Sequence, residues 1–377
     1  MRIVILGAGP AGLYLAYLIR RRNPRADVRV IEQNPPDATF GFGVVFSERA
    51  LEFLDADDPE THAAIRPHLI GWRDITIDHR GEKVRIDGVG FTAIGRLHLL
   101  QVLQERLEQV GIVPQYNQAV ASVDDLGAAD LVVGADGVNS LVRRTFEGEF
   151  GTTTQTMSNR FVWYGTRKPF DTLTQTFLET PEGHFNAHHY RYSGSMSTFI
   201  VEVDEETFFR VGFDAMDEER TRAKCEQVFA ATLGGYPLVT NRSLWRQFPR
   251  IWNERWSHGR YVLVGDALRT AHFSIGSGSR LAMEDVIALD RALEANGEDV
   301  PAALAAYEAA RRPIVEKLYA AANASIDWYE RFPEHMKLEP YEFALSYMRR
   351  SERVSLEELR RNSPRFIAGV EAARAKA

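Results

Sequence analysis

Three glycines near the start of the chain have the spacing of a site that binds a pyrophosphate. Gly7, Gly9 and Gly12 follow the apolar run 2–6 and open the apolar stretch 13–19. In a strand–turn–helix unit the first glycine permits a tight turn and the second lets the backbone approach phosphates, while the third lets helix and strand pack closely. The helix N-terminus adds partial positive charge. The pattern predicts a dinucleotide site at this turn.

An acid stands where such a site needs a ribose contact. Glu32 ends the apolar run 28–31 and comes twenty residues after Gly12, the spacing at which a carboxylate binds a ribose hydroxyl. Residues 3–19 are also apolar enough to suggest a signal peptide or membrane anchor. Three glycines and Pro10 interrupt that run, it is too short to span a bilayer, and no cleavage-site pattern follows. We therefore expect neither.

Two later segments repeat the order of buried strand, polar turn and helix. Residues 130–144 contain the turn Gly134-Ala135-Asp136-Gly137, and residues 261–267 end in Gly265-Asp266-Ala267. A glycine-rich turn at 274–279 and a helix at 281–293 follow the second of these. Because open α/β sheets bind ligands at the carboxyl ends of their strands, the three turns are expected to meet one extended ligand.

The segments between these turns differ in character. Residues 72–92 alternate apolar and polar side chains around Arg80-Gly81, which predicts a hairpin. Residues 96–107 have the apolar spacing of an amphipathic helix that begins at Arg96. Residues 150–260 are aromatic and strand-rich, with one helix at about 218–233, and indicate an inserted antiparallel sheet. The chain is helical from Pro301 onward.

Composition limits the class of protein. With 377 residues, 45% of them apolar and 26% charged, the chain is large enough for two closely joined domains. A net charge of −7 argues against nucleic-acid binding. The single cysteine, Cys225, excludes an internal disulfide and fits a reducing cytoplasm. No cluster has zinc spacing, since on a strand His188 and His189 would point to opposite faces. We expect no metal site.

The three ordered motifs resemble those of FAD-dependent aromatic monooxygenases of the p-hydroxybenzoate hydroxylase fold, over nearly the whole chain. The resemblance implies an α/β fold: a Rossmann-like FAD-binding domain (1–70 with 93–150 and 255–320), an inserted antiparallel substrate domain (71–92 and 151–254) and C-terminal helices (321–377). The implied cofactor-binding residues are Gly7, Gly9, Ala11, Gly12, Glu32, Gln33, Val44, Val45, Arg96, Asp136, Asp266, Gly276, Ser277, Gly278 and Ser279.

Departures from the family pattern point to a subfamily. Arg269, His272 and Arg280 stand near positions where many relatives have His, Pro and Asn, so substrate handling and flavin mobility can differ. The segments 41–47, 162–166, 196–202 and 272–276 are similar to those of salicylyl-CoA 5-hydroxylases. They are also similar to the hydroxylase part of anthraniloyl-CoA monooxygenase/reductases and to the tryptophan-modifying hydroxylase of violacein biosynthesis. The length of the chain favours the salicylyl-CoA type over the bifunctional anthraniloyl-CoA enzymes.

The resemblance implies a reaction. NADH or NADPH reduces FAD, O₂ adds at the flavin C4a carbon, and the hydroperoxide transfers oxygen to an activated ring, converting salicylyl-CoA to gentisyl-CoA. A base near the substrate hydroxyl would raise the rate. The candidates are His188, His189 and His272, with His272 favoured because its turn should border the flavin ring. Packing or a structural hydrogen bond is an equal alternative for each histidine. The expected substrate walls are Trp163, Tyr164, Tyr190, Phe199 and Phe273.

Other classes stay open at this point. The alternatives are hydroxylation of anthraniloyl-CoA or a tryptophan-derived indole, a flavin reductase or dehydrogenase, and a non-catalytic FAD-binding protein. The expected partner is a small aromatic molecule carried as a CoA thioester, with no membrane partner and a monomeric or homodimeric state. Cations must then meet the CoA phosphates. The candidate arginines are Arg73, Arg80, Arg191, Arg246 and Arg250.

Overall fold

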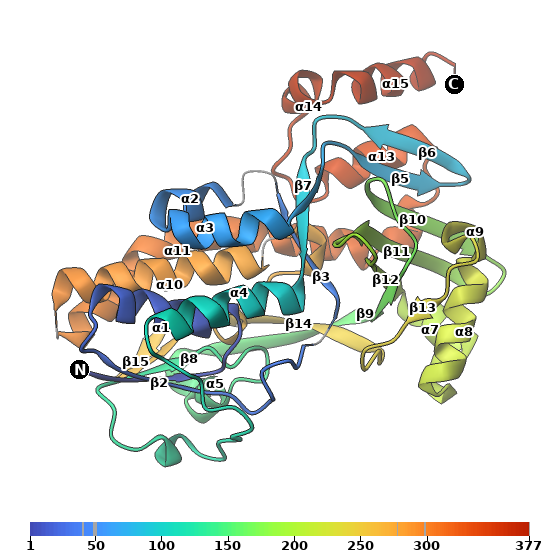
Figure 1. The fold of residues 1–377 in the computed structure, drawn as a ribbon. Coiled ribbons are helices and arrows are strands. Elements are labelled where there is room, and N and C mark those ends of the chain that lie inside the picture. The colour runs from blue at the N-terminus through green and yellow to red at the C-terminus, as the bar shows by residue number, and fades with distance from the viewer. Residues whose placement is uncertain (40, 48–50, 277, 298, 377) are drawn as a thin grey trace.

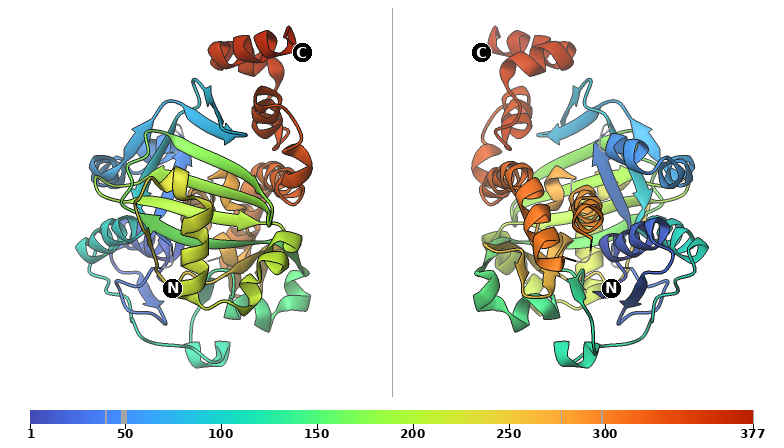
Figure 2. Two further views of the ribbon diagram at one scale, coloured as in Figure 1. Left: turned by 90° about the vertical axis from the view of Figure 1, so that its right-hand side faces the viewer. Right: turned by 90° about the vertical axis from the view of Figure 1, so that its left-hand side faces the viewer.

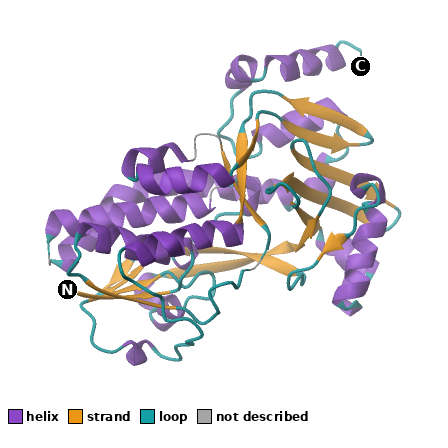
Figure 3. Cartoon of the chain, viewed as in Figure 1, coloured by secondary structure: helices purple, strands orange, loops and turns teal. Residues whose placement is uncertain are grey.

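The computed structural model describes residues 1–39, 41–47, 51–276, 278–297 and 299–376. The molecule has two parts, with the N-terminus in one and the C-terminus beside the other, and two long strands run between them (Figure 1). Figure 3 shows that the long helices of the first part gather on one side of its sheet, with short helices on the other side. None of the helices in these ranges is long and apolar enough to cross a membrane.

The first part is built on a five-stranded sheet in the order β15-β16-β8-β1-β2. All neighbours are parallel except the edge strand β15. The strands are nearly continuous apolar runs because helices cover the sheet and bury them. Their bounds are β1 Arg2–Leu6, β2 Asp27–Ile31, β8 Leu131–Gly134, β15 Ser257–His258 and β16 Tyr261–Leu263.

The helices of this part include every one that the sequence predicts there. Helix α1 (Pro10–Arg22) packs between α4 (Arg96–Gln109) and α10 (Gly278–Asn296), and α10 packs on α11 (Val300–Tyr329). Shorter helices are α2 (Glu52–Asp57), α3 (Pro59–Ile65), α5 (Leu141–Thr145) and α6 (Glu147–Phe150).

The second part is built on a larger, mainly antiparallel sheet in the order β13-β9-β12-β11-β10-β5-β6, with β14 also paired to β9. Strands β9 and β14 are the long pair that joins the two parts (Figure 1). Bounds are β5 Ile75–His79, β6 Glu82–Ile86, β9 Thr152–Thr166, β10 Leu173–Thr180, β11 Gly183–Arg191, β12 Ser197–Val203, β13 Leu238–Val239 and β14 Arg246–Asn253.

The predicted hairpin within 72–92 is present as β5 and β6. His79 pairs with Glu82, so the turn has two residues, Arg80 and Gly81. Both have positive φ, 53° and 76°, which is the turn whose twist matches that of the strands. A third, three-stranded sheet in the order β3-β7-β4 is formed by β3 Gly43–Ser47, β7 Phe91–Gly95 and β4 Ile70–Trp72.

Helices cover both sides of the large sheet. The predicted helix at about 218–233 is divided into α8 (Glu218–Val228) and α9 (Ala230–Leu233), which share an apolar core with α7 (Glu205–Val211) and one face of the sheet. The C-terminal helices share a second core with β5 and β6, and Figure 2 shows them along the edge of the molecule that carries the C-terminus. They are α12 Phe332–His335, α13 Pro340–Arg349, α14 Leu356–Asn362 and α15 Pro364–Arg374.

Candidate active site

Two positions of the first turn, Gly7 and Gly12, require glycine. Gly7 has a φ of +103°, and a Cβ built on it would lie 2.4 Å from the carbonyl oxygen of Ala135. A Cβ on Gly12 would lie 2.0 Å from the carbonyl oxygen of Gly7. Side chains would therefore separate β1 from β8 and α1 from the turn.

Gly9 has the opposite environment. A Cβ on Gly9 would meet no described protein atom within 4 Å, so this residue faces open space. It is the N-cap of α1, which has no side-chain cap and no acid in its first turn. The amide groups at the start of α1 therefore have no side-chain acceptor, which suits an anion such as a pyrophosphate.

Glu32 is held at the end of β2, beside the same turn. One carboxylate oxygen accepts from the amide of Ala8 at 2.9 Å, and the other accepts from the amide of Asn34 at 2.9 Å. The carboxylate that the sequence predicts as a ribose contact is thus held by two backbone donors. Gln33, the next residue, is exposed.

The second and third turns lie directly beside the first. The Ala135 amide donates to the Leu6 carbonyl at 2.9 Å, and the Val264 amide donates to the Gly134 carbonyl at 3.1 Å. The tips of β1, β8 and β16 are therefore neighbours at one edge of the sheet. Asp136 accepts from the Leu141 amide at 2.6 Å at the start of α5, and burial raises the pKa of Asp136.

Asp266 and Arg96 mark a recess next to these tips. The Asp266 side chain is accessible to solvent. The surrounding protein nevertheless raises its pKa by desolvation, and the positive charge of Arg96 is the strongest that opposes this rise. The pKa of Arg96 is lowered by burial, with Asp266 opposing the change. A side chain that solvent reaches but protein surrounds lies inside a deep recess. This recess presents a cation, Arg96, and an anion, Asp266, to a ligand.

The last turn approaches strand β3 across this recess. A Cβ on Gly276 would lie 3.4 Å from Val45 Cγ1, and one on Gly265 would lie 3.7 Å from the Cβ of Ala11. Gly278 and Ser279 begin α10, and Val44 precedes Val45 on β3. Ser277 lies outside the described residues. Gly276, in the turn before α10, thus lies beside Val45 of β3.

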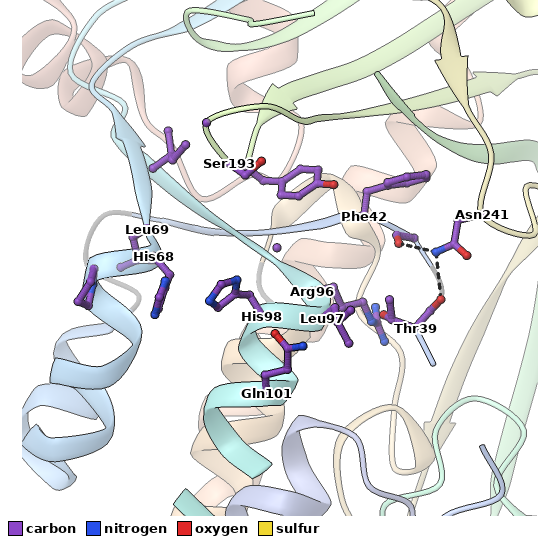
Figure 4. A pocket seen from close by; sticks show the side chains of 16 residues that line it. Thr39, Phe42, His68, Leu69, Arg96, Leu97, His98, Gln101, Ser193 and Asn241 are labelled. Carbon is purple, nitrogen blue, oxygen red and sulfur yellow. Dashed lines mark hydrogen bonds between the residues drawn. The ribbon is translucent and has the colours of Figure 1, made fainter. Parts of the chain in front are cut away.

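A cavity of about 540 Å³ opens near Arg96. Figure 4 shows Arg96 and Gln101 on α4, with Asn241 bonded to the carbonyls of Thr39 and Gly41 on the facing side. The rings of His68 and His98 lie 4.0 Å apart on its wall. This cavity adjoins the recess through Arg96.

The register of the large sheet divides the predicted substrate residues between its two faces. Directly opposed residues share a face. His188 is opposite Gln175 and Ile200, and Ile200 is opposite Trp163. These four side chains therefore lie on one face. Tyr190 lies two residues from His188 on the same face, where its hydroxyl donates to the Gly43 carbonyl at 2.9 Å.

The other face carries His189, Phe199 and Tyr164, which are opposed to one another in the register. Phe199 and Tyr164 belong to the apolar core beneath α7–α9, and the His189 ring packs 4.0 Å from that of Phe170. His189 also bonds Thr176 Oγ1 at 2.9 Å. The structure does not bring these three residues together with His188, because adjacent strand positions alternate between faces.

A buried polar cluster lies on the face of His188. His188 Nε2 and Glu202 Oε2 are 3.2 Å apart, and Asn159 Nδ2 donates to the other Glu202 oxygen at 3.0 Å. Glu202 is 2% exposed. Burial raises its pKa and lowers the pKa of His188 to about 3, so the imidazole is neutral at pH 7.

His272 joins this cluster from the turn before α10. Its Nδ1 accepts from the Ser274 amide at 3.4 Å and bonds Ser274 Oγ at 2.8 Å, so the neutral ring carries its proton on Nε2. Burial lowers the pKa of His272 to about 3, and the charge of Glu202 opposes that shift. Phe273 stands between the histidines, with ring centres 5.1 Å from His188 and 4.1 Å from His272.

Residues at the ends of α11 and α13 complete the cluster. The Tyr329 ring stacks 5.1 Å from His188 and its hydroxyl donates to Gln175 Oε1 at 3.3 Å. Arg350 donates to the Ser274 carbonyl at 2.7 Å and to Ser325 Oγ at 3.1 Å. The sequence did not indicate Glu202, Asn159, Gln175, Tyr329 or Arg350 as site residues. An acid within the apolar strand 197–203 was the one available signal.

The two arginines that depart from the family pattern have structural partners. Arg269 forms a buried ion pair with Asp285 at 2.6 Å, and Arg280 pairs with Glu284 at 2.7 Å on α10. Among the described residues, no group of three or more His, Cys, Asp or Glu side chains could hold a metal ion.

The glycine turn, the fixed Glu32 carboxylate and the charged recess at adjacent strand tips fit FAD, and comparison with known proteins agrees. The family model "FAD binding domain" matches residues 1–322, and the chain belongs to this family. It is a FAD-dependent aromatic hydroxylase of the p-hydroxybenzoate hydroxylase fold, as the sequence predicts.

Individual relatives are similar over most of the chain. Salicyloyl-CoA 5-hydroxylase of Streptomyces sp is 42% identical over 93% of this chain and 70% of its own length. The 3-hydroxy-4-methyl-anthranilyl-[aryl-carrier protein] 5-monooxygenase of Streptosporangium sibiricum is 37% identical over 89% of this chain and 90% of its own length. Protodeoxyviolaceinate monooxygenase of Chromobacterium violaceum is 34% identical over 92% of this chain and 94% of its own length.

Solved structures support the fold. A structure of 2-methyl-3-hydroxypyridine-5-carboxylic acid oxygenase superposes with a TM-score of 0.74 at 19% identity, over 94% of this chain and 98% of that one. The tetracycline destructase Tet(51) gives a TM-score of 0.64 at 18% identity, over 99% and 97% of the chains.

Proposed function

We propose that the protein hydroxylates salicylyl-CoA at C5 to give gentisyl-CoA, consuming NADH or NADPH and O₂. Support comes from the 42% identical salicyloyl-CoA 5-hydroxylase. A second relative acts on an anthranilyl group bound to a carrier protein. Both names describe an aromatic acid attached to a larger carrier, CoA in one case and a carrier protein in the other.

The observation that carries this proposal is the buried His188–Glu202–His272 cluster. It lies between the sheet face and the turn that leads to Gly276, which approaches β3. Phe161, Trp163 and Phe273 have neighbouring rings with centres 5.0 to 6.1 Å apart. Such a set offers flat apolar walls to a ring and titratable groups to its hydroxyl.

When bound, FAD reduced by the nicotinamide supplies an electrophilic oxygen derived from O₂. The residues of this chain that would hold FAD are Gly7, Gly9 and Gly12 at the pyrophosphate, Glu32 at the ribose, and Arg96 and Asp266 in the recess. The turn after His272 and strand β3 would border the flavin ring. The protein's remaining task is to position and activate the substrate.

His272 is the proposed base. In salicylyl-CoA the hydroxyl is para to C5, and loss of its proton makes C5 more electron-rich. His272 is neutral at pH 7 because burial lowers its pKa to about 3. The Ser274 amide donates to Nδ1 at 3.4 Å, so Nδ1 is the unprotonated nitrogen and takes up the substrate proton through the Ser274 hydroxyl, 2.8 Å away. The carboxyl group of Glu202 then stabilises the imidazolium. A base whose pKa lies near the working pH contributes about 10²- to 10⁴-fold in rate, and the low pKa of His272 places its contribution at the lower end of that range.

The aromatic residues and α11 exclude water from the His188–Glu202–His272 cluster. Tyr329 lies over His188, and its backbone carbonyl accepts from Asn159 Nδ2 at 2.8 Å, which ties α11 to the sheet. His188, Glu202 and His272 are all less than 5% exposed. The cluster is therefore dry, which strengthens the electrostatic effect of Glu202.

The experiment is a substrate comparison with the purified flavoprotein. NADH and O₂ are supplied with salicylyl-CoA, anthraniloyl-CoA or a tryptophan-derived indole, and products are identified by mass spectrometry. The proposal predicts gentisyl-CoA with NADH consumed in equal amount. Hydroxylation of anthraniloyl-CoA or the indole alone would assign the other substrate, and NADH oxidation without a hydroxylated product would indicate a reductase.

A further inference from the structure

A second hollow lies on the C-terminal helices, separate from the cavity of Figure 4. It has a volume of about 740 Å³ and lies along the end of α11, α12 and α13, with Arg374 of α15 at its edge. We call it the C-terminal groove. Its charged residues are Asp327, Arg331, Glu342, Arg349, Arg350, Glu352 and Arg374, together with the histidine His335.

The arginines of the C-terminal groove outnumber the acids available to them. Glu342 pairs with Arg374 at 2.5 Å, and Asp327 pairs with Arg250 at 2.5 Å. Within the described ranges no carboxylate forms an ion pair with Arg331, Arg349 or Arg350, and Glu352 is the remaining acid of the lining. The groove is therefore locally cationic in a chain whose net charge is −7. Such a surface attracts anionic ligands.

Arg350 connects this groove to the buried cluster. It lines the groove and donates to the Ser274 carbonyl at 2.7 Å, and the Ser274 hydroxyl bonds His272 Nδ1 at 2.8 Å. Trp328 lines the groove, while the next residue, Tyr329, stacks on His188. The two sites are thus separated by the last turn of α11 and the Arg350 side chain.

We infer that the C-terminal groove binds the phosphate groups of the CoA portion of the thioester substrate. This inference rests on the proposed function, because only a thioester substrate carries phosphates away from its ring. Arg331 and Arg349, which are exposed, offer planar donors that match phosphate oxygens. The flexible arm of CoA then passes Arg350 to place the ring at His272. None of the arginines expected from the sequence lines this groove.

The test combines two substrates with one double variant. In R331A/R349A, the KM for salicylyl-CoA should rise about tenfold or more, since charged hydrogen bonds to phosphate are lost. The KM for salicyl-pantetheine, which lacks the nucleotide phosphates, should not change. R361A removes an exposed arginine on α14 outside the groove and should leave both values unchanged. FAD absorbance and the melting temperature verify folding.

The same measurements distinguish CoA from the other phosphate source, the nicotinamide nucleotide. A raised KM for NADH with an unchanged KM for salicylyl-CoA would overturn the inference. Equal KM values for salicylyl-CoA in wild type and R331A/R349A would do the same, while leaving the proposed function intact.

Direct binding separates this inference from the proposed function. Benzoyl-CoA lacks the activating hydroxyl, so calorimetry reports its binding without turnover. If benzoyl-CoA binds wild type and loses about tenfold in affinity in R331A/R349A, the groove is supported even should salicylyl-CoA not be hydroxylated. If benzoyl-CoA fails to bind wild type, or binds both proteins equally, the groove does not hold CoA.

Discussion

His188 and His189 are adjacent in β11, yet they lie on opposite faces of the large sheet. His188 meets Glu202, Phe273 and Tyr329. His189 packs against Phe170 and Phe199 in the core beneath α7–α9. One residue type therefore occurs in the candidate site and in the core at neighbouring positions, which provides a matched pair for mutagenesis.

H188Q is expected to lower kcat at least tenfold while FAD content stays near that of wild type. The reason is loss of the side chain that bonds Glu202 next to the ring site. H189Q should instead lower the melting temperature, because His189 is buried and bonds Thr176. Steady-state kinetics and thermal melts of the two variants test this prediction. A larger loss of kcat in H189Q than in H188Q would contradict the assignment of His188 to the face of the candidate site.

H272A is expected to reduce product formation about 10²-fold or more while FAD stays bound, since the proposed base is removed. The readout is the rate of product formation at saturating substrate, with FAD absorbance as the control. Turnover at the wild-type rate would remove His272 from the mechanism.

E202Q preserves the shape of the carboxyl group but removes its charge. Glu202 opposes the fall in the pKa of His272, so the variant loses the group that stabilises a protonated His272. We expect kcat to fall about tenfold, with little change in the KM for NADH. Rapid-mixing kinetics that show an unchanged hydroxylation step would argue against this role.

Stability should fall as pH decreases from about 6.5 towards 3. Burial lowers the pKa of His188 and His272 from 6.5 to about 3, so in this window the unfolded state binds protons that the folded state does not. Each such histidine removes up to about 1.4 kcal/mol of stability per pH unit. Glu202 acts in the opposite direction because its pKa is raised.

Comparison of wild type with H272N isolates one histidine, since the other titrating groups are common to both proteins. Denaturant unfolding at several pH values should give a shallower loss of stability for H272N below pH 6.5. Parallel curves for the two proteins would show that His272 titrates normally in the folded state.

The glycines of the first turn should respond differently to substitution. G9V places a side chain where no atom of the described residues lies within 4 Å, so the apoprotein should fold but bind FAD at least tenfold more weakly. G12A places its Cβ 2.0 Å from the Gly7 carbonyl oxygen and should lower the melting temperature of the apoprotein itself. Flavin titration and thermal melts separate the two effects; normal FAD affinity in G9V would mean that the pyrophosphate lies elsewhere.

The sequence predicts the cofactor half of the molecule well because its signals are local. Gly7, Gly9 and Gly12 lie within one strand–turn–helix unit, and the turns at Asp136 and Asp266 follow strands whose apolar runs identify them as buried. Parallel strands place their carboxyl ends at one edge, so the order of motifs is sufficient to bring three distant turns together.

The substrate half is harder to predict because it depends on register and on distant contacts. Alternation shows that His188 and His189 face opposite ways, but the sequence does not say which of them faces the site. Tyr329 and Arg350 reach the cluster from helices more than a hundred residues after β11. Nothing local to 321–377 indicates that these helices pack against the sheet.

The central claim is that this chain holds FAD at three strand tips and uses it to place an oxygen atom from O₂ on a thioester-bound ring. The most direct test supplies the purified protein with NADH, salicylyl-CoA and ¹⁸O₂ and measures the product by mass spectrometry. We predict gentisyl-CoA carrying one ¹⁸O atom. A protein that is colourless and does not take up FAD, or a product whose new oxygen comes from water, would contradict the account.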